Sequence, residues 1–188
     1  MSAGGFKGRT KELEERFFSE QDKKLLEALR EQAASKERKK ALAEASGIAD
    51  EDLLDRLDEL DVHGETLAAL SLVPLIAVAW ADGAVDAKER GAVLAAAEQR
   101  GIEPQHPGHA LLERWLQEKP DAGLLDVWKG YVAGLAPSLS QSARDALKTD
   151  LLGRARAVAE AAGGLLGLGN KVSRSEQAVL DSLEKAFD

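Results

Sequence analysis

The sequence has no cysteine, few aromatic residues and no long uninterrupted apolar run. The lack of cysteine excludes disulfide frameworks, thiolate metal sites and a cysteine nucleophile. Aromatic residues make up only 4% of the chain, and β-branched residues seldom follow one another, a balance that favours helices over strands. The 188 residues are enough for one good core, or for one domain with a helical extension.

The longest apolar stretch, Leu67 to Ala81, is fifteen residues long and contains Ser71 and Pro74. A membrane-spanning helix needs about 20 residues, so this stretch predicts a buried helix of a bundle. The N-terminal region is charged from Lys7 onward and has no apolar segment, unlike a secretory signal or a membrane anchor. We therefore expect a cytoplasmic protein.

Charge is spread unevenly along the chain. Residues 1–40 carry eleven Lys and Arg against eight Asp and Glu, whereas residues 41–188 carry fourteen against twenty-five. An acidic body argues against nucleic-acid binding, because that affinity depends on neutralising phosphates. The basic cluster from Ser35 to Lys40 predicts a solvated helix face, and contact with an anionic lipid surface or an acidic partner is the alternative.

Helical periodicity accounts for nearly every segment, and no stretch alternates apolar and polar residues long enough to propose a strand. The sequence predicts an all-α fold: a compact helical bundle of two related helix-turn-helix halves with an N-terminal helical extension. We place the extension at residues 1–62 and the bundle at residues 63–188. Helices are expected at about residues 10–34, 35–45, 50–60, 66–81, 86–100, 110–118, 121–135, 142–162 and 173–187. The apolar stripe of the first comprises Phe17, Phe18, Leu25, Leu26 and Leu29.

A weak internal repeat relates "VDAKERGAVLAAAE", from Val85, to "VSRSEQAVLDSLEK", from Val172. Each copy has a Val, then a capping residue, then a Glu three positions after the cap. Asp86 with Glu89, and Ser173 with Glu176, therefore predict two capping boxes. The Asp82-Gly83 dipeptide predicts the turn that ends the preceding helix. With only two copies, a closed bundle is expected rather than a solenoid.

The stretches "VAWADGAVDAKE" and "AAGGLLGLGNKVSRSE", in an all-helical context, resemble the TerB-like family, which is associated with tellurite resistance. The resemblance covers about residues 66–188. It implies a compact helical domain in which acidic residues near the two turns have been proposed to hold a divalent cation. In this chain the implied metal ligands are Asp82, Asp86, Glu89 and Glu176. The second copy departs from the pattern, with Gly169-Asn170 in place of Asp-Gly and Ser173 in place of the capping Asp.

Carboxylate oxygens are the ligands that calcium and magnesium prefer. The spacing is not that of an EF-hand, because Ala84 and Val93 stand where ligands are required. Two interpretations of the acidic turn stay open at this point: helix caps alone, or a site for calcium or magnesium. No other cofactor is predicted.

No nucleophile, histidine and acid stand at a spacing that predicts catalysis, so we do not expect an enzyme. The leading hypothesis is a non-enzymatic cytoplasmic TerB-like interaction module, linked to stress response or to complexes at a membrane surface. Its alternative is a divalent-cation sensor or buffer that uses the acidic residues at the turns. A protein partner is expected and nucleic acid is not; contact with a membrane surface, without spanning it, and the oligomeric state stay open.

Overall fold

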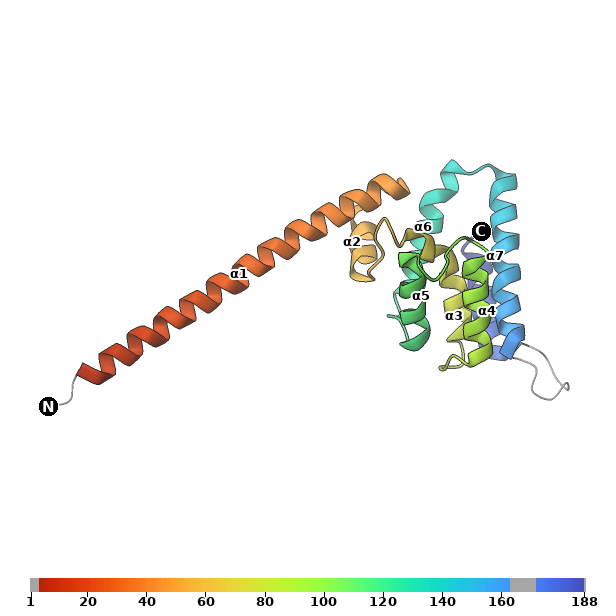
Figure 1. Cartoon of the computed structure of the whole chain (residues 1–188). Coiled ribbons are helices and arrows are strands. Elements are labelled where there is room, and N and C mark those ends of the chain that lie inside the picture. The colour runs from red at the N-terminus through yellow and green to blue at the C-terminus, as the bar shows by residue number, and fades with distance from the viewer. Residues whose placement is uncertain (1–3, 163–171, 188) are drawn as a thin grey trace.

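The computed structural model describes residues 4–162 and 172–187, and within them it contains helices and no strand. The predicted all-α bundle is therefore confirmed. Figure 1 shows the shorter helices gathered into one body, from which the first helix projects far outward. The elements in chain order are α1 (Gly4–Ser46), α2 (Glu51–Glu59), the 3-10 helix η1 (Leu67–Leu72), α3 (Val73–Ala79), α4 (Ala87–Glu98), α5 (Pro107–Gln117), α6 (Leu124–Leu135), the 3-10 turn η2 (Ala136–Ser138), α7 (Gln141–Ala162) and α8 (Arg174–Lys185).

The N-terminal region forms one helix, α1, and not the two that we predicted with a break at Ser35. The Ser35 hydroxyl does not cap a new helix but donates a hydrogen bond to the Asp58 carboxylate, 2.7 Å away. The helix ends at the predicted place, because Gly47 adopts a φ of +73° that a side chain would disfavour.

The apolar stretch near residue 74 also differs from its prediction. We expected one helix over residues 66–81, whereas the structure has η1 followed by α3. Pro74 lies in the first turn of α3, where its missing N–H costs nothing. Its ring would clash with the carbonyl four residues earlier in a continuous α-helix, so the preceding turn tightens into a 3-10 helix.

The short helix α3 lies at the centre of the body and contacts all five longer helices from α4 to α8. Its side chains Val73, Leu75, Ile76, Val78 and Ala79 are at most 1% exposed, which confirms the predicted buried helix. None of the helices in the described ranges is long and apolar enough to cross a bilayer.

The core continues across residue 62. Leu42 at the end of α1 and Leu53, Leu54 and Leu57 of α2 belong to the same buried cluster as α3. The end of α1 and all of α2 therefore pack as part of the body. The division into an extension and a second domain stays a prediction.

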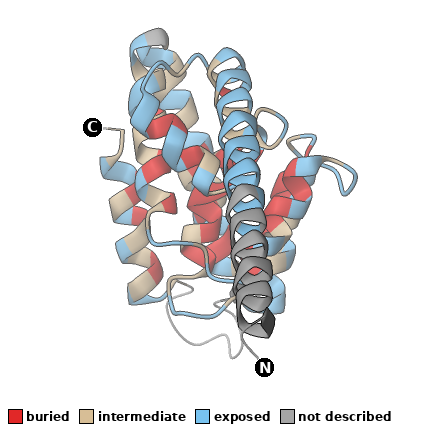
Figure 2. Ribbon diagram, turned by 90° about the vertical axis from the view of Figure 1, so that its left-hand side faces the viewer, coloured by how far each residue is buried: buried red, intermediate tan, exposed pale blue. Residues whose placement is uncertain are grey.

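The three leucines of the apolar stripe predicted for the first helix do not pack on the body. Leu25, Leu26 and Leu29 are 60%, 54% and 52% exposed. In Figure 2, α1 is pale blue, the colour of exposed residues, along most of the part whose side chains the structure describes. The side chains of Phe17 and Phe18 lie outside the described residues.

Candidate functional site

The predicted capping box at the start of α4 is present. The Asp86 carboxylate accepts hydrogen bonds from the backbone N–H of Lys88 at 2.7 Å and of Glu89 at 2.8 Å. The Glu89 carboxylate in turn accepts from the N–H of Asp86 at 2.8 Å. Each side chain thus satisfies an N–H that the first turn of a helix leaves without a partner.

The second copy repeats this geometry at the start of α8. The Ser173 hydroxyl accepts from the N–H of Glu176 at 3.2 Å, and the Glu176 carboxylate accepts from the N–H of Ser173. The turn before α4 is also as predicted: Gly83 has a φ of +98°, and the Asp82 carboxylate accepts from the N–H of Ala84 at 3.1 Å. The four predicted metal ligands therefore lie at helix starts and a turn.

The two capping glutamates are buried, with Glu89 3% and Glu176 6% exposed. The pKa of Glu89 is raised from 4.5 to about 7, and burial is the largest cause, because a charged carboxylate loses its hydration there. The negative charges of Asp86, Asp82 and Glu176 contribute to this rise, whereas the hydrogen bond from the N–H of Asp86 opposes it. The charges of the other three predicted ligands therefore act together on the Glu89 carboxyl.

Metal binding at these residues stays a prediction. Within residues 4–162 and 172–187, no three His, Asp or Glu side chains are grouped in a way that could hold a metal ion. Gly169 and Asn170, which stand where the second copy departs from the Asp-Gly pattern, lie outside the described residues. The described residues form two helix caps, and the buried carboxyl of one of them, Glu89, has a raised pKa.

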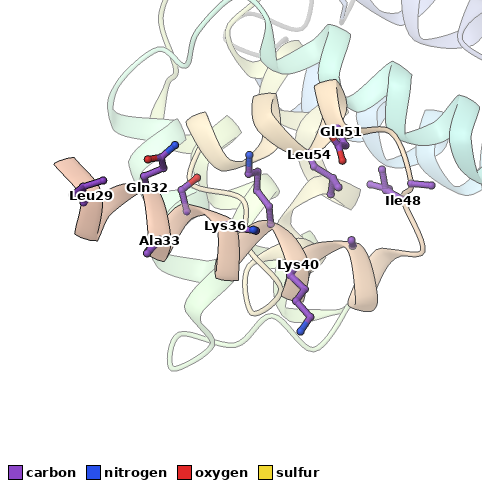
Figure 3. A pocket seen from close by; sticks show the side chains of 12 residues that line it. Leu29, Gln32, Ala33, Lys36, Lys40, Ile48, Glu51 and Leu54 are labelled. Carbon is purple, nitrogen blue, oxygen red and sulfur yellow. The ribbon is translucent and has the colours of Figure 1, made fainter. Parts of the chain in front are cut away.

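A second feature, which the sequence analysis did not identify as a site, is a groove between α1 and α2 of about 770 Å³. Figure 3 shows its side chains, which come from the second half of α1, from α2 and from the loop between them. Apolar side chains and lysines both line it. The apolar ones are Leu29, Ala33, Ala43, Ile48, Ala49 and Leu54, and the lysines are Lys36, Lys39 and Lys40.

The lysines of this groove differ in their partners. Lys39 pairs with Asp55 of α2. Lys36 and Lys40 are exposed, and neither takes part in an ion pair among the side chains that the structure describes. The groove therefore combines an apolar lining with two lysines that form no ion pair among the described side chains, and the Glu51 carboxylate also lines it.

A hydrogen-bonded cluster centred on Asp58 holds α1 against α2 beside this groove. The Asp58 carboxylate accepts from Arg38 Nε at 2.8 Å and from Ser35, and its side chain is only 12% exposed. The hydrogen bond from Arg38 is the largest cause that lowers the pKa of Asp58. Because Arg38 and Ser35 are fixed in this way, the α1 wall of the groove has a defined position.

The spacing of the α1 residues in the groove could have revealed it. Leu29, Ala33, Lys36, Lys40 and Ala43 follow one another at intervals of four, three, four and three, which places them on one face of a helix. The sequence pattern assigns the leucines at 25, 26 and 29 to one helix and the basic cluster at 35–40 to the next. The predicted break at Ser35 concealed that they share a face.

Comparisons with protein-family models, with curated proteins and with solved structures give no match to this chain. The resemblance to the TerB-like family therefore stays a prediction from the quoted stretches.

Proposed function

We propose that the chain is a non-enzymatic interaction module whose binding element is the projecting helix α1. The observation that carries the proposal is the row of exposed leucines, Leu25, Leu26 and Leu29, which leads directly into the groove between α1 and α2. A contiguous apolar surface of this kind on a water-facing helix typically marks a site that a partner covers.

The length of α1 supports the same proposal. Among the side chains that the structure describes, those that attach α1 to the body lie at Ser35 and beyond. The thirty-one helical residues before Ser35 extend over about 46 Å at 1.5 Å per residue. A helix without tertiary contacts is only marginally stable in water. A partner that packs along this segment would supply the contacts that its own body does not.

Crosslinking from two matched positions tests the proposal. A photoactivatable residue in place of Leu29 is expected to trap a protein in the native host, whereas one in place of the exposed Arg156 on α7 is expected to trap none. Equal trapping from both positions, or none from position 29, would remove α1 as the binding element.

The setting of this module is proposed from the sequence. The Asp82-Gly83 turn and the following cap resemble the TerB-like family, and this supports a role in stress response or in complexes at a membrane surface. A cytoplasmic location is part of the same proposal.

A divalent-cation sensor is the second candidate, and one observation favours it. The buried Glu89 carboxyl is under the combined influence of Asp82, Asp86 and Glu176, and a calcium or magnesium ion would relieve that repulsion. Calorimetric titration of the wild type with either ion is then expected to give heat that Glu89→Gln loses. No heat at millimolar ion would exclude a sensor at this turn.

A further inference from the structure

We infer that the groove between α1 and α2 binds an amphipathic helix of a protein partner. This helix presents an apolar stripe to the groove and a row of carboxylates to Lys36 and Lys40. The inference rests on the proposed function, because it gives the chemistry of the partner that α1 binds. Every side chain that lines the groove lies in the part of the chain whose side chains the structure describes.

The groove has the length and the apolar floor of a helix-binding site. On α1 its residues run from Leu29 to Ala43, which is about 21 Å, or about four turns of a partner helix. Leu54 of α2 lines the groove and is only 7% exposed, and Ile48 and Ala43 are partly buried against the core. A groove of this kind between two helices is a surface on which an amphipathic helix lays its apolar face.

The exposed leucines of α1 continue this surface. Leu25, Leu29 and Ala33 follow at intervals of four, so they lie on one face of the helix. Both leucines are more than half exposed, and Leu29 and Ala33 line the groove itself. A partner helix that fills the groove and reaches one turn beyond its N-terminal end therefore also covers the two leucines.

The lysines of the groove determine which charges the partner carries. The hydrogen bond from Lys39 to Asp55 raises the pKa of this lysine, and the negative charge of Glu51 contributes to the rise. The acids of α2 that lie nearest the groove therefore already have Lys39 as a counter-charge. Lys36 and Lys40 are exposed and form no ion pair among the described side chains, and Figure 3 shows Lys40 pointing away from α2. Two positive charges thus border the open side of the groove along α1.

Carboxylates on one flank of a helix complement these two lysines. Lys36 and Lys40 are four residues apart, a rise of about 6 Å along α1. Acidic residues three or four apart on the partner helix have nearly the same rise, so each lysine meets a carboxylate. The flank of the partner that faces α2 carries no acid, because Glu51 lines that side of the groove and would repel it. The partner helix is therefore acidic on one flank only.

The acidic character of α2 favours a helix over an anionic bilayer as the occupant. This helix contains five acidic residues and one basic residue. A flat anionic surface that reached Lys36 and Lys40 would also come close to these acids and be repelled, whereas a single helix can place its carboxylates on the α1 side alone. The two lysines also lie between apolar residues of the groove, with Leu29 before them and Ile48 after them. A lipid chain would instead need its charged group at one end of the groove.

Fluorescence anisotropy with the full chain and synthetic peptides is the first test. The probe is a hydrocarbon-stapled helix of about four turns, with a stripe of leucines, glutamates along one flank and glutamines along the other. The chain is expected to bind it about tenfold more tightly than the same peptide with lysines in place of the glutamates, because two ion pairs replace two like-charge contacts. The same peptide with serines in place of the leucines is expected not to bind. Equal affinity for the glutamate and lysine peptides, or no binding of the glutamate peptide at about 100 micromolar, would overturn the inference.

A pair of charge-reversed variants tests the role of the two lysines. Lys36→Glu with Lys40→Glu is expected to reverse the preference, so that the lysine peptide binds more tightly than the glutamate peptide. The matched control is Lys23→Glu with Lys24→Glu, which changes the net charge equally at exposed positions of α1 outside the groove. The control is expected to keep the wild-type preference, and circular dichroism of each variant establishes that the chain still folds. An equal loss in both variants would show that net charge, and not the groove, determines binding.

Disulfide crosslinking tests the position of the bound helix. Because the chain has no cysteine, one introduced cysteine reacts selectively with a glutamate peptide that carries a cysteine in its leucine stripe. Ala33 and Ala34 are both exposed, but only Ala33 lines the groove, since neighbouring residues of a helix point about 100° apart. Ala33→Cys is expected to form the disulfide and Ala34→Cys is not. Equal yields from the two variants would contradict binding in the groove.

The outcomes separate this inference from the proposed function. If the glutamate peptide does not bind while a photoactivatable residue at position 29 still traps a protein, only the inference fails. If position 29 also traps nothing, the proposed function fails with it. Binding to vesicles of phosphatidylserine and phosphatidylcholine that Lys36→Glu with Lys40→Glu abolishes, together with no binding of the glutamate peptide, would replace the partner helix with a lipid surface.

Discussion

The two ends of α1 show the same residue type in opposite environments. Leu42, near its C-terminal end, is 1% exposed and belongs to the core, whereas Leu25, in its projecting part, is 60% exposed. Both positions are helical, so helix formation does not distinguish them. The difference comes from α2, which folds back beside residues 35–46, whereas no other helix in the described part of the chain lies beside the earlier turns. Local sequence makes the helix, and only distant segments determine which of its leucines are buried.

The largest predicted effect tests this difference directly. Leu42→Ala is expected to lower the free energy of unfolding by about 2–5 kcal/mol, because it removes buried methyl groups and leaves a cavity. Leu26→Ala, made on an exposed side chain, is expected to change it by no more than about 0.5 kcal/mol. Urea denaturation of both variants provides the comparison. A similar loss for the two would mean that the projecting segment folds as part of the body.

The next prediction concerns a charge inside the body. The pKa of Glu89 is about 7 in the folded chain against 4.5 when unfolded. Between these values the folded state binds a proton that the unfolded state releases, so this group lowers stability as pH rises from about 4.5 to about 7. Since one pKa unit corresponds to about 1.4 kcal/mol, the loss is at most about 3 kcal/mol.

Glu89→Gln removes that titration while keeping an oxygen to accept the Asp86 N–H. Near pH 4.5 the variant and the wild type are expected to have the same free energy of unfolding. Above pH 7 the variant is expected to be more stable, by the free energy that the wild type loses as the pH rises. Glu98→Gln is the matched control, because Glu98 lies on the same helix and is exposed. A stability difference between Glu89→Gln and wild type that does not grow with pH would contradict the raised pKa.

Features set by local sequence were predictable. The caps at Asp86 and Ser173 and the stop at Gly47 were each identified from a few neighbouring residues, since a cap satisfies N–H groups within its own first turn. The all-helical class followed from periodicity over longer windows.

Features that depend on contacts between distant residues were not predictable. The groove exists because Arg38 and Ser35 meet Asp58, twenty or more residues away. The repeat predicted two capping glutamates, but not that the charge of Glu176 would act on Glu89. In both cases the missing information was which helices pack together, and a single sequence does not contain it in its local pattern.

The smallest predicted effect comes from one substitution made at both ends of α1. Ala28 and Ala41 are both exposed and both lie inside the helix, so replacing either with Gly lowers helix propensity by about 1 kcal/mol. In Ala41→Gly this cost is expected to appear in the free energy of unfolding, because residues 35–46 unfold together with the core. In Ala28→Gly, measured at a concentration where the chain is monomeric, it is expected to lower far-UV helicity while the urea midpoint stays unchanged. The reason is that a segment without contacts to the body can unfold locally while the body stays folded. An equal shift of the urea midpoint in both variants would show instead that α1 unfolds as one unit.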